Sequence, residues 1–409
     1  MCVRCEISRR ALLAGGGALA ASLVSGTAAA RIKPADMVPL IGPGFKPIDR
    51  DEQGLWEQMD RVEEEIAGTN LLIADNGIQH YVQQLIGKVG GPAAKDMRIY
   101  LLRIPEFNAM MFPSGFAVVF SGLLLRMRDE AQLAGVIAHE SGHFLRRHMI
   151  RQWRDMRRKS DLLSIGAMVA GIGGAGAGVY LGDYVQLAQL GTLLSLFRYN
   201  RELEAEADAM GLRLISEAGY APMAMSDTWA QLIGELDASA KYRRKHRDRG
   251  YDLFETHPAA ESRMADLRIS AAEMTVPGRH YDTGRDRYLS TIAPIRQMLL
   301  DDQVKLNDPG ASQYVIETLA RDGWNGLLRF YEGEVWRLRN RDSEGDWTRA
   351  AQSYAIAVAY PDAPAEAWRW HGVALMKEGR QSEARAAFSH YLSMEPHAVD
   401  AAYIRQMIG

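Results

Sequence analysis

The sequence predicts a mostly helical α+β protein, with a small β-sheet in its N-terminal half and a helical repeat region at its C-terminal end. Three observations predict this class. Apolar residues recur at helical spacing, as in Leu55, Met59 and Val62. Two short runs rich in branched residues are separated by proline and glycine before residue 121. Two similar segments near the C-terminus lie 34 residues apart.

Length and composition exclude several classes of protein. A chain of 409 residues is too long for one ordinary domain, and 47% hydrophobic with 24% charged residues is typical of a globular protein. The net charge of -3 gives no basic field, so no nucleic-acid partner is expected. Cys2 and Cys5 lie at the extreme N-terminus, where they could not form a core disulfide or a thiolate zinc site.

The first thirty residues are expected to be a signal peptide. Arg9 and Arg10 precede an uncharged run, 11–30, that ends in three alanines, as a small-residue cleavage site requires. The paired arginines resemble a twin-arginine signal, and a general secretory signal is the alternative. Both predict an exported, periplasmic protein of a bacterium.

The segment 31–280 is expected to form the first folded domain. Its apolar spacing predicts one or two amphipathic helices over 49–88, short strands at 97–104 and 117–120, and a helix that starts at Asp129 and Glu130. Acidic residues at a helix start are favoured by the helix dipole.

Two other segments of this domain bear on membrane contact. Residues 162–182, within an expected apolar hairpin at about 161–195, carry no charge and are rich in glycine. Each interior glycine costs a helix about 0.8 to 1 kcal/mol, so a close-packed hairpin or a membrane-surface element is favoured over a membrane span. The basic run 241–249 is read as a solvated loop, with attraction to anionic lipid headgroups as the alternative.

The C-terminal part is expected to be a helical connector, 281–345, followed by tetratricopeptide-like repeats, 346–409. Ala350 and Tyr354 recur as Ala384 and Phe388. One complete unit and a partial one are fewer than such arrays usually need, so docking on the first domain would supply stability.

A pair of histidines four residues apart carries the strongest chemical signal. His139 and His143 bracket Glu140-Ser141-Gly142 in the predicted helix. Residues four apart share a helix face, so both imidazoles project to one point, as two ligands of a tetrahedral ion must. Glu140 lies about 100° round from His139, near enough to act as general base on a water. The alternative, histidines that are merely core or surface groups, is disfavoured because histidine is scarce in this chain.

A second predicted helix, 200–208, offers a third ligand. Glu204 would close a His, His, Glu set and leave a fourth position open to water, as in catalytic zinc sites. Asp208 lies four residues further on the same face and would accept a hydrogen bond from a ligand imidazole. One Zn²⁺ per chain is therefore expected.

The combination of these motifs resembles a known superfamily. His-Glu-x-x-His followed by Arg-x-x-Glu-x-Glu-Ala-Asp is similar to the HtpX-like and CAAX-prenyl-protease gluzincin peptidases. More narrowly, it resembles exported BepA-like proteases with C-terminal tetratricopeptide repeats. The similarity covers 50–268, although Asn200 stands where serine is common and Met110-Met111 replaces smaller residues. It implies a zincin-type metallopeptidase domain with zinc on His139, His143 and Glu204.

Two further histidines and one strand are also assigned from the sequence. The resemblance places His257 near the metal, as an oxyanion stabiliser or a ligand of the resting site, with a capping role in its proline loop as the alternative. His148, five residues past His143, points off the ligand face and is predicted at the surface. The run 111–120 is a candidate edge strand on which substrate would pair, with candidate contacts at Ser114, Gly115, Phe116, Ala117 and Val118.

The function expected from these features is a zinc endopeptidase for misfolded or unassembled exported proteins, whose repeats bind a protein partner. The alternative is an assembly factor whose repeats bind partners while its peptidase activity is latent. An integral membrane protease is a third interpretation, and it depends on 162–182 spanning the bilayer.

Overall fold

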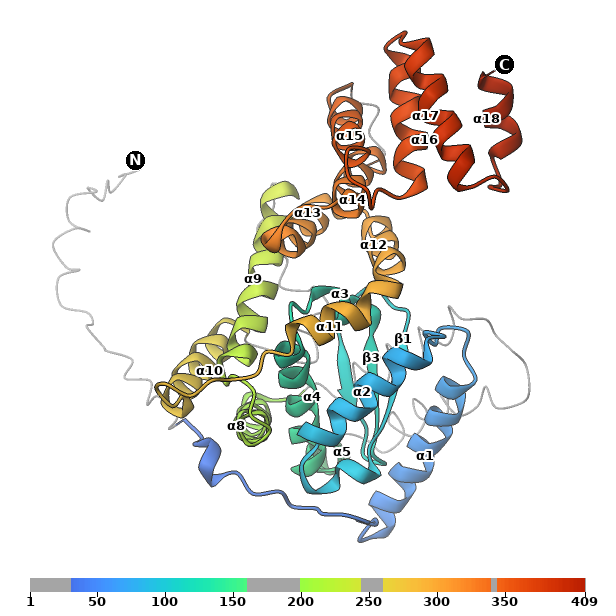
Figure 1. The fold of residues 1–409 in the computed structure, drawn as a ribbon. Helices are drawn as coiled ribbons and strands as arrows, with labels where there is room; N and C mark the ends of the chain where they lie inside the picture. The colour runs from blue at the N-terminus through green and yellow to red at the C-terminus, as the bar shows by residue number, and fades with distance from the viewer. Residues whose placement is uncertain (1–30, 160–198, 244–259, 340–343, 409) are drawn as a thin grey trace, which may run out of the picture.

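The computed structural model describes residues 31–159, 199–243, 260–339 and 344–408 (Figure 1). The expected signal peptide, the Gly-rich hairpin, most of the basic run and His257 lie outside the described residues. In the parts of the chain that are described, no helix has both the length and the apolar character that a membrane crossing needs. The predicted class, mostly helical with a small sheet, is confirmed.

The first helices form where polar caps precede apolar stripes. After a short 3-10 turn, η1 (Pro34–Asp36), come α1 (Arg50–Ala67) and α2 (Asn76–Val89). Asp49 and Asp75 cap α1 and α2 by accepting hydrogen bonds from backbone N–H groups of the first turn. Leu55, Met59, Val62 and Ile66 are buried along one face of α1, as the spacing predicts.

A three-stranded sheet follows the 3-10 turn η2 (Gly91–Asp96). Its strands are β1 (Arg98–Leu102), β2 (Ala109–Met111) and β3 (Phe116–Phe120), in the order β1-β3-β2. β3 pairs in parallel with β1 and antiparallel with β2. All five residues of β3 are buried, as expected of a strand with neighbours on both sides.

The prediction that the run 111–120 is an edge strand is wrong. Phe116, Ala117 and Val118 lie in the central strand, and Ser114 and Gly115 lie in the turn that leads into it. Val118 pairs with Tyr100 on one side and with Met110 on the other, so its backbone groups have strand partners. The edge strands of this sheet are β1 and β2, and a proline-containing turn folds β3 back onto β2.

Helices pack around this sheet and supply the rest of the domain. They are α3 (Ser121–Arg126), α4 (Glu130–Leu145), α5 (His148–Lys159), α8 (Arg201–Glu217), α9 (Met223–Arg243) and α10 (Ala260–Met274). α4 contacts β2, α8 and α9, and it is buried along almost its whole length. The segment before α1 crosses the end of α4, where the Leu40 N–H donates to the Leu145 carbonyl over 2.9 Å.

The C-terminal part is a run of helices that begins beside α2 and α4 and ends far from α1, at the end of the molecule where α16, α17 and α18 lie (Figure 1). It comprises α11 (Arg285–Ile292), η4 (Ala293–Ile295), α12 (Arg296–Lys305), α13 (Pro309–Leu319), η5 (Ala320–Asp322), α14 (Gly326–Arg337), α15 (Glu344–Ala357), α16 (Ala365–Lys377), α17 (Gln381–Met394) and α18 (Ala401–Ile408). α14 pairs with α15, and α16 pairs with α17.

The two helix pairs share one packing detail. A Cβ added to Gly333 on α14 would meet the Tyr354 ring of α15 at 2.5 Å, and one added to Gly372 on α16 would meet the Phe388 ring of α17 at 2.8 Å. In each pair, therefore, a glycine makes room for an aromatic ring of the second helix. α14 lies inside the expected connector, 281–345, yet it supplies the first helix of a pair.

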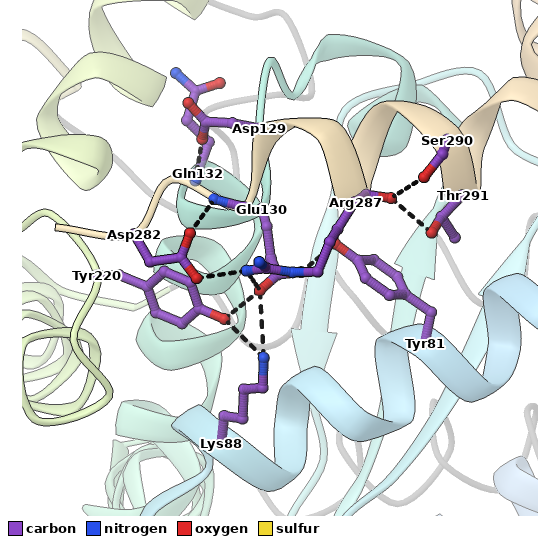
Figure 2. Close-up of polar contacts among 11 residues, drawn as sticks. Tyr81, Lys88, Asp129, Glu130, Gln132, Tyr220, Asp282, Arg287, Ser290 and Thr291 are labelled. Atoms are coloured by element: carbon purple, nitrogen blue, oxygen red, sulfur yellow. Dashed lines mark hydrogen bonds and ion pairs between the residues drawn. The ribbon is translucent and has the colours of Figure 1, made fainter.

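A buried carboxylate joins this C-terminal run to the domain. Figure 2 shows Glu130, in the first turn of α4, with the side chains of Tyr81, Lys88, Tyr220 and Arg287 pointing at its carboxylate. Arg287 of α11 donates to it over 2.9 and 3.2 Å, and Tyr81 of α2 over 2.8 Å. Glu130 is 1% exposed, so these partners replace the water it has lost.

Candidate metal centre

The two histidines of the motif lie on α4 with their rings in contact. α4 begins after Asp129, whose side chain accepts a hydrogen bond from the Gln132 N–H over 2.9 Å. His139, Glu140 and His143 are all buried. The Nε2 atoms of His139 and His143 lie 3.1 Å apart, with the rings at 80° to one another. This spacing brings both nitrogens to a single point.

Glu204 brings a carboxylate to that point from α8. Asn200 caps α8 by accepting from the Leu203 N–H, and this places Glu204 in the first turn. Its oxygens lie 3.6 Å from Nε2 of His139 and 3.7 Å from Nε2 of His143. Ligand atoms from the three residues all lie within 4.8 Å of one another.

Zinc fits this set of donors. Two imidazole nitrogens and a carboxylate oxygen are ordinary zinc ligands, with bonds of about 2.0 to 2.2 Å, and tetrahedral angles then place ligand atoms roughly 3.4 Å apart. The observed separations of 3.1, 3.6 and 3.7 Å bracket that value. The three residues could therefore hold one ion with little movement and leave one position open.

Glycines let α4 and α8 approach closely enough to form the set. A Cβ at Gly142 of α4 would meet the Ala207 carbonyl oxygen at 2.9 Å, and one at Gly211 of α8 would meet the His139 backbone nitrogen at 3.1 Å. The neighbouring atoms are backbone and cannot turn aside. The two ligand-bearing helices therefore touch main chain to main chain.

A second carboxylate and an arginine support His139. The Nδ1 atom of His139 lies 2.9 Å from Asp208, and Arg263 of α10 donates to both oxygens of Asp208 over 2.6 and 2.9 Å. Arg263 also lies 2.5 Å from Glu204. Burial raises the pKa of the Asp208 carboxyl, but Arg263 and His139 outweigh this and hold it well below its usual value. Asp208 is therefore charged and accepts the His139 proton.

The prediction that His148 is a surface residue is wrong. Its side chain is fully buried, with Nδ1 2.9 Å from Nδ1 of His143 and Nε2 3.2 Å from Glu206. The prediction assumed that the helix continues, whereas α4 ends at Leu145 and Arg147 has a left-handed φ of 58°. This turn brings the chain back, so His148 faces His143.

Other groups complete the surroundings of His143. The Tyr199 ring stacks on the His143 imidazole at 3.9 Å and 20°. Glu206 also accepts from Arg146 and Arg151, each over 2.9 Å. Burial raises the pKa of Glu206, but His148 and the two arginines outweigh it and keep the group ionised.

Comparison with known sequences agrees with this geometry. Residues 73–271 match the profile "Peptidase family M48". This region belongs to peptidase family M48. The M48 domain carries the candidate site, because the ligand set, Asp208, His148 and Arg263 all fall within the matched residues. Peptidases of this family bind zinc, and the superfamily resemblance predicted from the sequence is confirmed.

Curated relatives resemble the M48 domain. The "Beta-barrel assembly-enhancing protease" of Escherichia coli (strain K12) is 29% identical over 214 residues, 51% of this chain and 42% of that protein. The "Mitochondrial metalloendopeptidase OMA1" of Schizosaccharomyces pombe is 28% identical over 190 residues, 46% of this chain and 51% of that protein. The chain thus spans about half the length of the curated relatives it matches.

The structure brings together His139, Glu140, His143, Glu204 and Asp208, and it places the predicted contact strand in the middle of the sheet. Sequence reasoning missed three groups at the M48 site: Arg263, Glu206 and Tyr199. A sequence signal existed for Glu206, because it lies between Glu204 and Asp208 in an acidic run. None existed for Arg263, which lies 124 positions beyond His139 and approaches its Nε2 to 3.5 Å.

Proposed function

We propose that this protein is a zinc-dependent endopeptidase that cleaves misfolded or unassembled exported proteins. The observation that carries the proposal is that the buried side chains of His139, His143 and Glu204 meet at one point. Glu140 lies on the same helix as the two histidines, between them in the sequence. Membership of family M48 supports it. Two histidines and one carboxylate leave room for water and substrate, unlike the four protein ligands of a structural zinc site.

The chain's own groups account for proton transfer. Zinc held at the site would polarise a peptide carbonyl and make a water molecule acidic at neutral pH. Glu140 would accept a proton from the attacking water and return it to the amine that leaves. Asp208 holds the His139 ring through Nδ1, so that Nε2 is left to face the metal site.

β2 lies at one edge of the sheet and offers a place for an extended substrate. The Phe120 N–H donates to the Asn108 carbonyl and the Phe112 N–H to the Phe116 carbonyl, so residues 108, 110 and 112 direct their backbone groups at β3. Ala109 and Met111 therefore direct theirs away from β3. A polypeptide strand can pair there only if it is unfolded locally, which favours misfolded or unassembled proteins as substrates.

The proposed setting comes from the ends of the chain and from the relatives. The sequence of residues 1–30 supports export to the periplasm, and the Escherichia coli relative is named an assembly-enhancing protease. The pairs α14–α15 and α16–α17 support tetratricopeptide-like repeats that bind a protein partner. In this proposal they deliver substrates to the M48 domain.

The test is Glu140→Gln in the full-length protein. Zinc content should be unchanged, while hydrolysis of a permanently unfolded protein should fall at least about 100-fold, because general base catalysis is lost. Glu202→Gln, the same change at an exposed acid on α8, should cleave normally. A Glu140→Gln protein that retains full activity would refute the proposal. The inactive variant also traps substrates in cells, and recovery of folded, assembled proteins alone would contradict the quality-control role.

A further inference from the structure

A segment between η1 and α1, the strap (residues 37–48), is held on the end of α4 through its backbone. The Leu40 N–H donates to the Leu145 carbonyl over 2.9 Å, and the Val38 carbonyl accepts from Nη1 of Arg146 over 2.9 Å. The Val38 and Leu40 side chains are 58% and 55% exposed, so they are not what fixes this part of the strap. Its backbone hydrogen bonds to the end of α4 are.

The strap also holds Arg147, which turns the chain back after α4. Arg147 has a left-handed φ of 58°, a conformation that residues with a side chain seldom adopt and that persists only where the surroundings hold it. Its guanidinium lies 5.1 Å from the ring centroid of Phe45 in the strap. It also pairs with the Glu52 carboxylate, which accepts from the Ile48 N–H over 3.0 Å. Two strap residues therefore fix this turn, one by direct contact and one through Glu52.

Arg146, beside this turn, joins the strap to the groups behind His143. Its Nε atom donates to Glu206 over 2.9 Å, while its Nη1 atom donates to the strap. The same Glu206 oxygen lies 3.2 Å from Nε2 of His148, whose Nδ1 lies 2.9 Å from Nδ1 of His143. One carboxylate oxygen thus contacts both Arg146 and His148, and His148 contacts a candidate metal ligand. A displaced strap would disturb this whole set of contacts.

We propose that the strap positions His148, and through it His143, and that Arg146 is the positioning residue that joins the strap to the site. This inference rests on the metal site of the proposed function and adds a second determinant of its affinity. The strap lies outside residues 73–271, which match family M48, so the matched region does not contain this connection. Supporting hydrogen bonds orient a ligand ring and raise its basicity. A displaced strap should therefore weaken metal binding although no ligand is changed.

A matched pair of arginine substitutions tests the connection. Arg213 of α8 also donates to a strap carbonyl, that of Met37, over 2.5 Å, but in the described part of the chain its other hydrogen bond goes to Glu217. Arg146→Gln should lower the zinc affinity of the full-length protein by about tenfold, and Arg213→Gln should change it by less than about twofold. Competition with a chromophoric chelator measures both. Equal affinities of the two variants would overturn the inference.

A second background separates positioning from general stabilisation. If Arg146 acts through His148, the effects of the two substitutions are not additive. In the His148→Ala protein, Arg146→Gln should then lower zinc affinity by less than about twofold further. A further loss as large as the loss in the wild-type background would show that Arg146 acts independently of His148, and it would overturn the inference.

The strap itself is tested at one backbone donor. Leu40→Pro removes the N–H that donates to Leu145, whereas Leu40→Ala keeps it and only shortens an exposed side chain. The proline variant should bind zinc at least about fivefold more weakly than the alanine variant. Equal affinities of the two folded variants would overturn the role of the strap. If Leu40→Pro does not fold, the pair Arg146→Gln and Arg213→Gln decides.

A measurement on the metal-free protein separates this inference from the proposed function. If the wild-type protein binds no zinc, the proposed function fails, and NMR of the histidine rings then tests the inference without metal. Arg146→Gln should shift the ring signals of His148 and His143, and Arg213→Gln should leave them in place. Equal shifts in both variants, or no shift in Arg146→Gln, would overturn the inference.

Discussion

The Nδ1 atom of His148 lies 2.9 Å from the Nδ1 atom of His143, and Nε2 of His148 lies 3.2 Å from Glu206. If Nε2 of His143 binds a metal, its proton is on Nδ1 and is donated to His148. His148 then carries its own proton on Nε2 and donates it to Glu206. His143, His148 and Glu206 thus form a chain of hydrogen bonds, in which the tautomer of His143 determines the tautomer of His148.

We predict that His148→Ala lowers zinc affinity by about 10- to 100-fold, as loss of such supporting hydrogen bonds usually does. Competition with a chromophoric chelator measures the change. His280→Ala, at an exposed histidine outside the site, is the matched control and should bind zinc normally. Unchanged affinity in a folded His148→Ala protein would show that His148 only fills space.

We predict that Arg263→Ala destabilises the metal-free protein by about 3 to 5 kcal/mol. The change leaves the buried carboxylates of Glu204 and Asp208 without their shared cation. Urea unfolding of the metal-free protein measures the loss. Arg268→Ala, at an exposed arginine of the same helix α10, should change stability by less than about 0.5 kcal/mol.

Added zinc should restore part of the stability of Arg263→Ala, because the ion binds only the folded protein and compensates Glu204. A variant that unfolds at the wild-type urea concentration without metal would rule out charge compensation by Arg263.

The hydrogen bonds to the buried Glu130 carboxylate predict how the stability of the fold depends on pH. Burial raises the pKa of Glu130, but hydrogen bonds from Arg287 and two tyrosines outweigh it and lower the pKa from 4.5 to about 2. A lowered folded-state pKa stabilises the fold above pH 4.5, and this stability is lost as the pH falls towards 2. Because Arg287 is 49% exposed, the contribution is on the order of 2 kcal/mol.

We predict that Glu130→Gln unfolds at a lower temperature than the wild type at pH 7 and that the difference closes between pH 4.5 and about 2. Thermal unfolding followed by circular dichroism across this range measures it. Glu217→Gln, at a carboxylate 58% exposed, should match the wild type throughout. A difference that is constant with pH would mean that the Glu130 charge is not responsible.

The packing of the paired C-terminal helices predicts that the same substitution has different effects at a glycine of α16 and at a glycine of α1. Gly372→Leu should destabilise α16–α17 by about 1 to 3 kcal/mol, because a Cβ there already meets the Phe388 ring at 2.8 Å. A Cβ added to Gly54 in α1 meets no atom within 4 Å, so Gly54→Leu should stabilise the helix or leave its stability unchanged. Limited proteolysis near the C-terminus detects the first effect. Equal resistance of both variants would contradict the packing described for this pair.

Local signals predicted the helices better than the contacts between them. Asp129 and the apolar stripe after Asp49 marked helix starts that α4 and α1 confirm. β1 and β3 were located within a few residues, whereas β2 was not predicted as a separate strand. The strand order was not predicted either, because a short apolar run carries no information on which strand lies beside it. The edge was therefore assigned to β3, which lies between β1 and β2.

The same distinction applies to the site. His139, Glu140 and His143 share a helix, so their spacing alone brought them together. His148 was misplaced because one left-handed residue, Arg147, ends the helical periodicity on which the prediction relied. Arg263 reaches the site through tertiary packing of α10, which no spacing rule within α4 or α8 could reveal.

The backbone contact between α4 and α8 has a consequence for the choice of metal. At Gly142 and Gly211 the distance between the two helices is set by main-chain atoms. Side-chain substitutions elsewhere cannot shorten this distance. An ion with longer bonds than zinc would need more space between the ligand atoms of His139, His143 and Glu204, whereas the two glycine contacts hold α4 and α8 close together. The preference for zinc over other ions would then depend on the contact between these two helices. Any sequence that keeps the two glycines would share this preference.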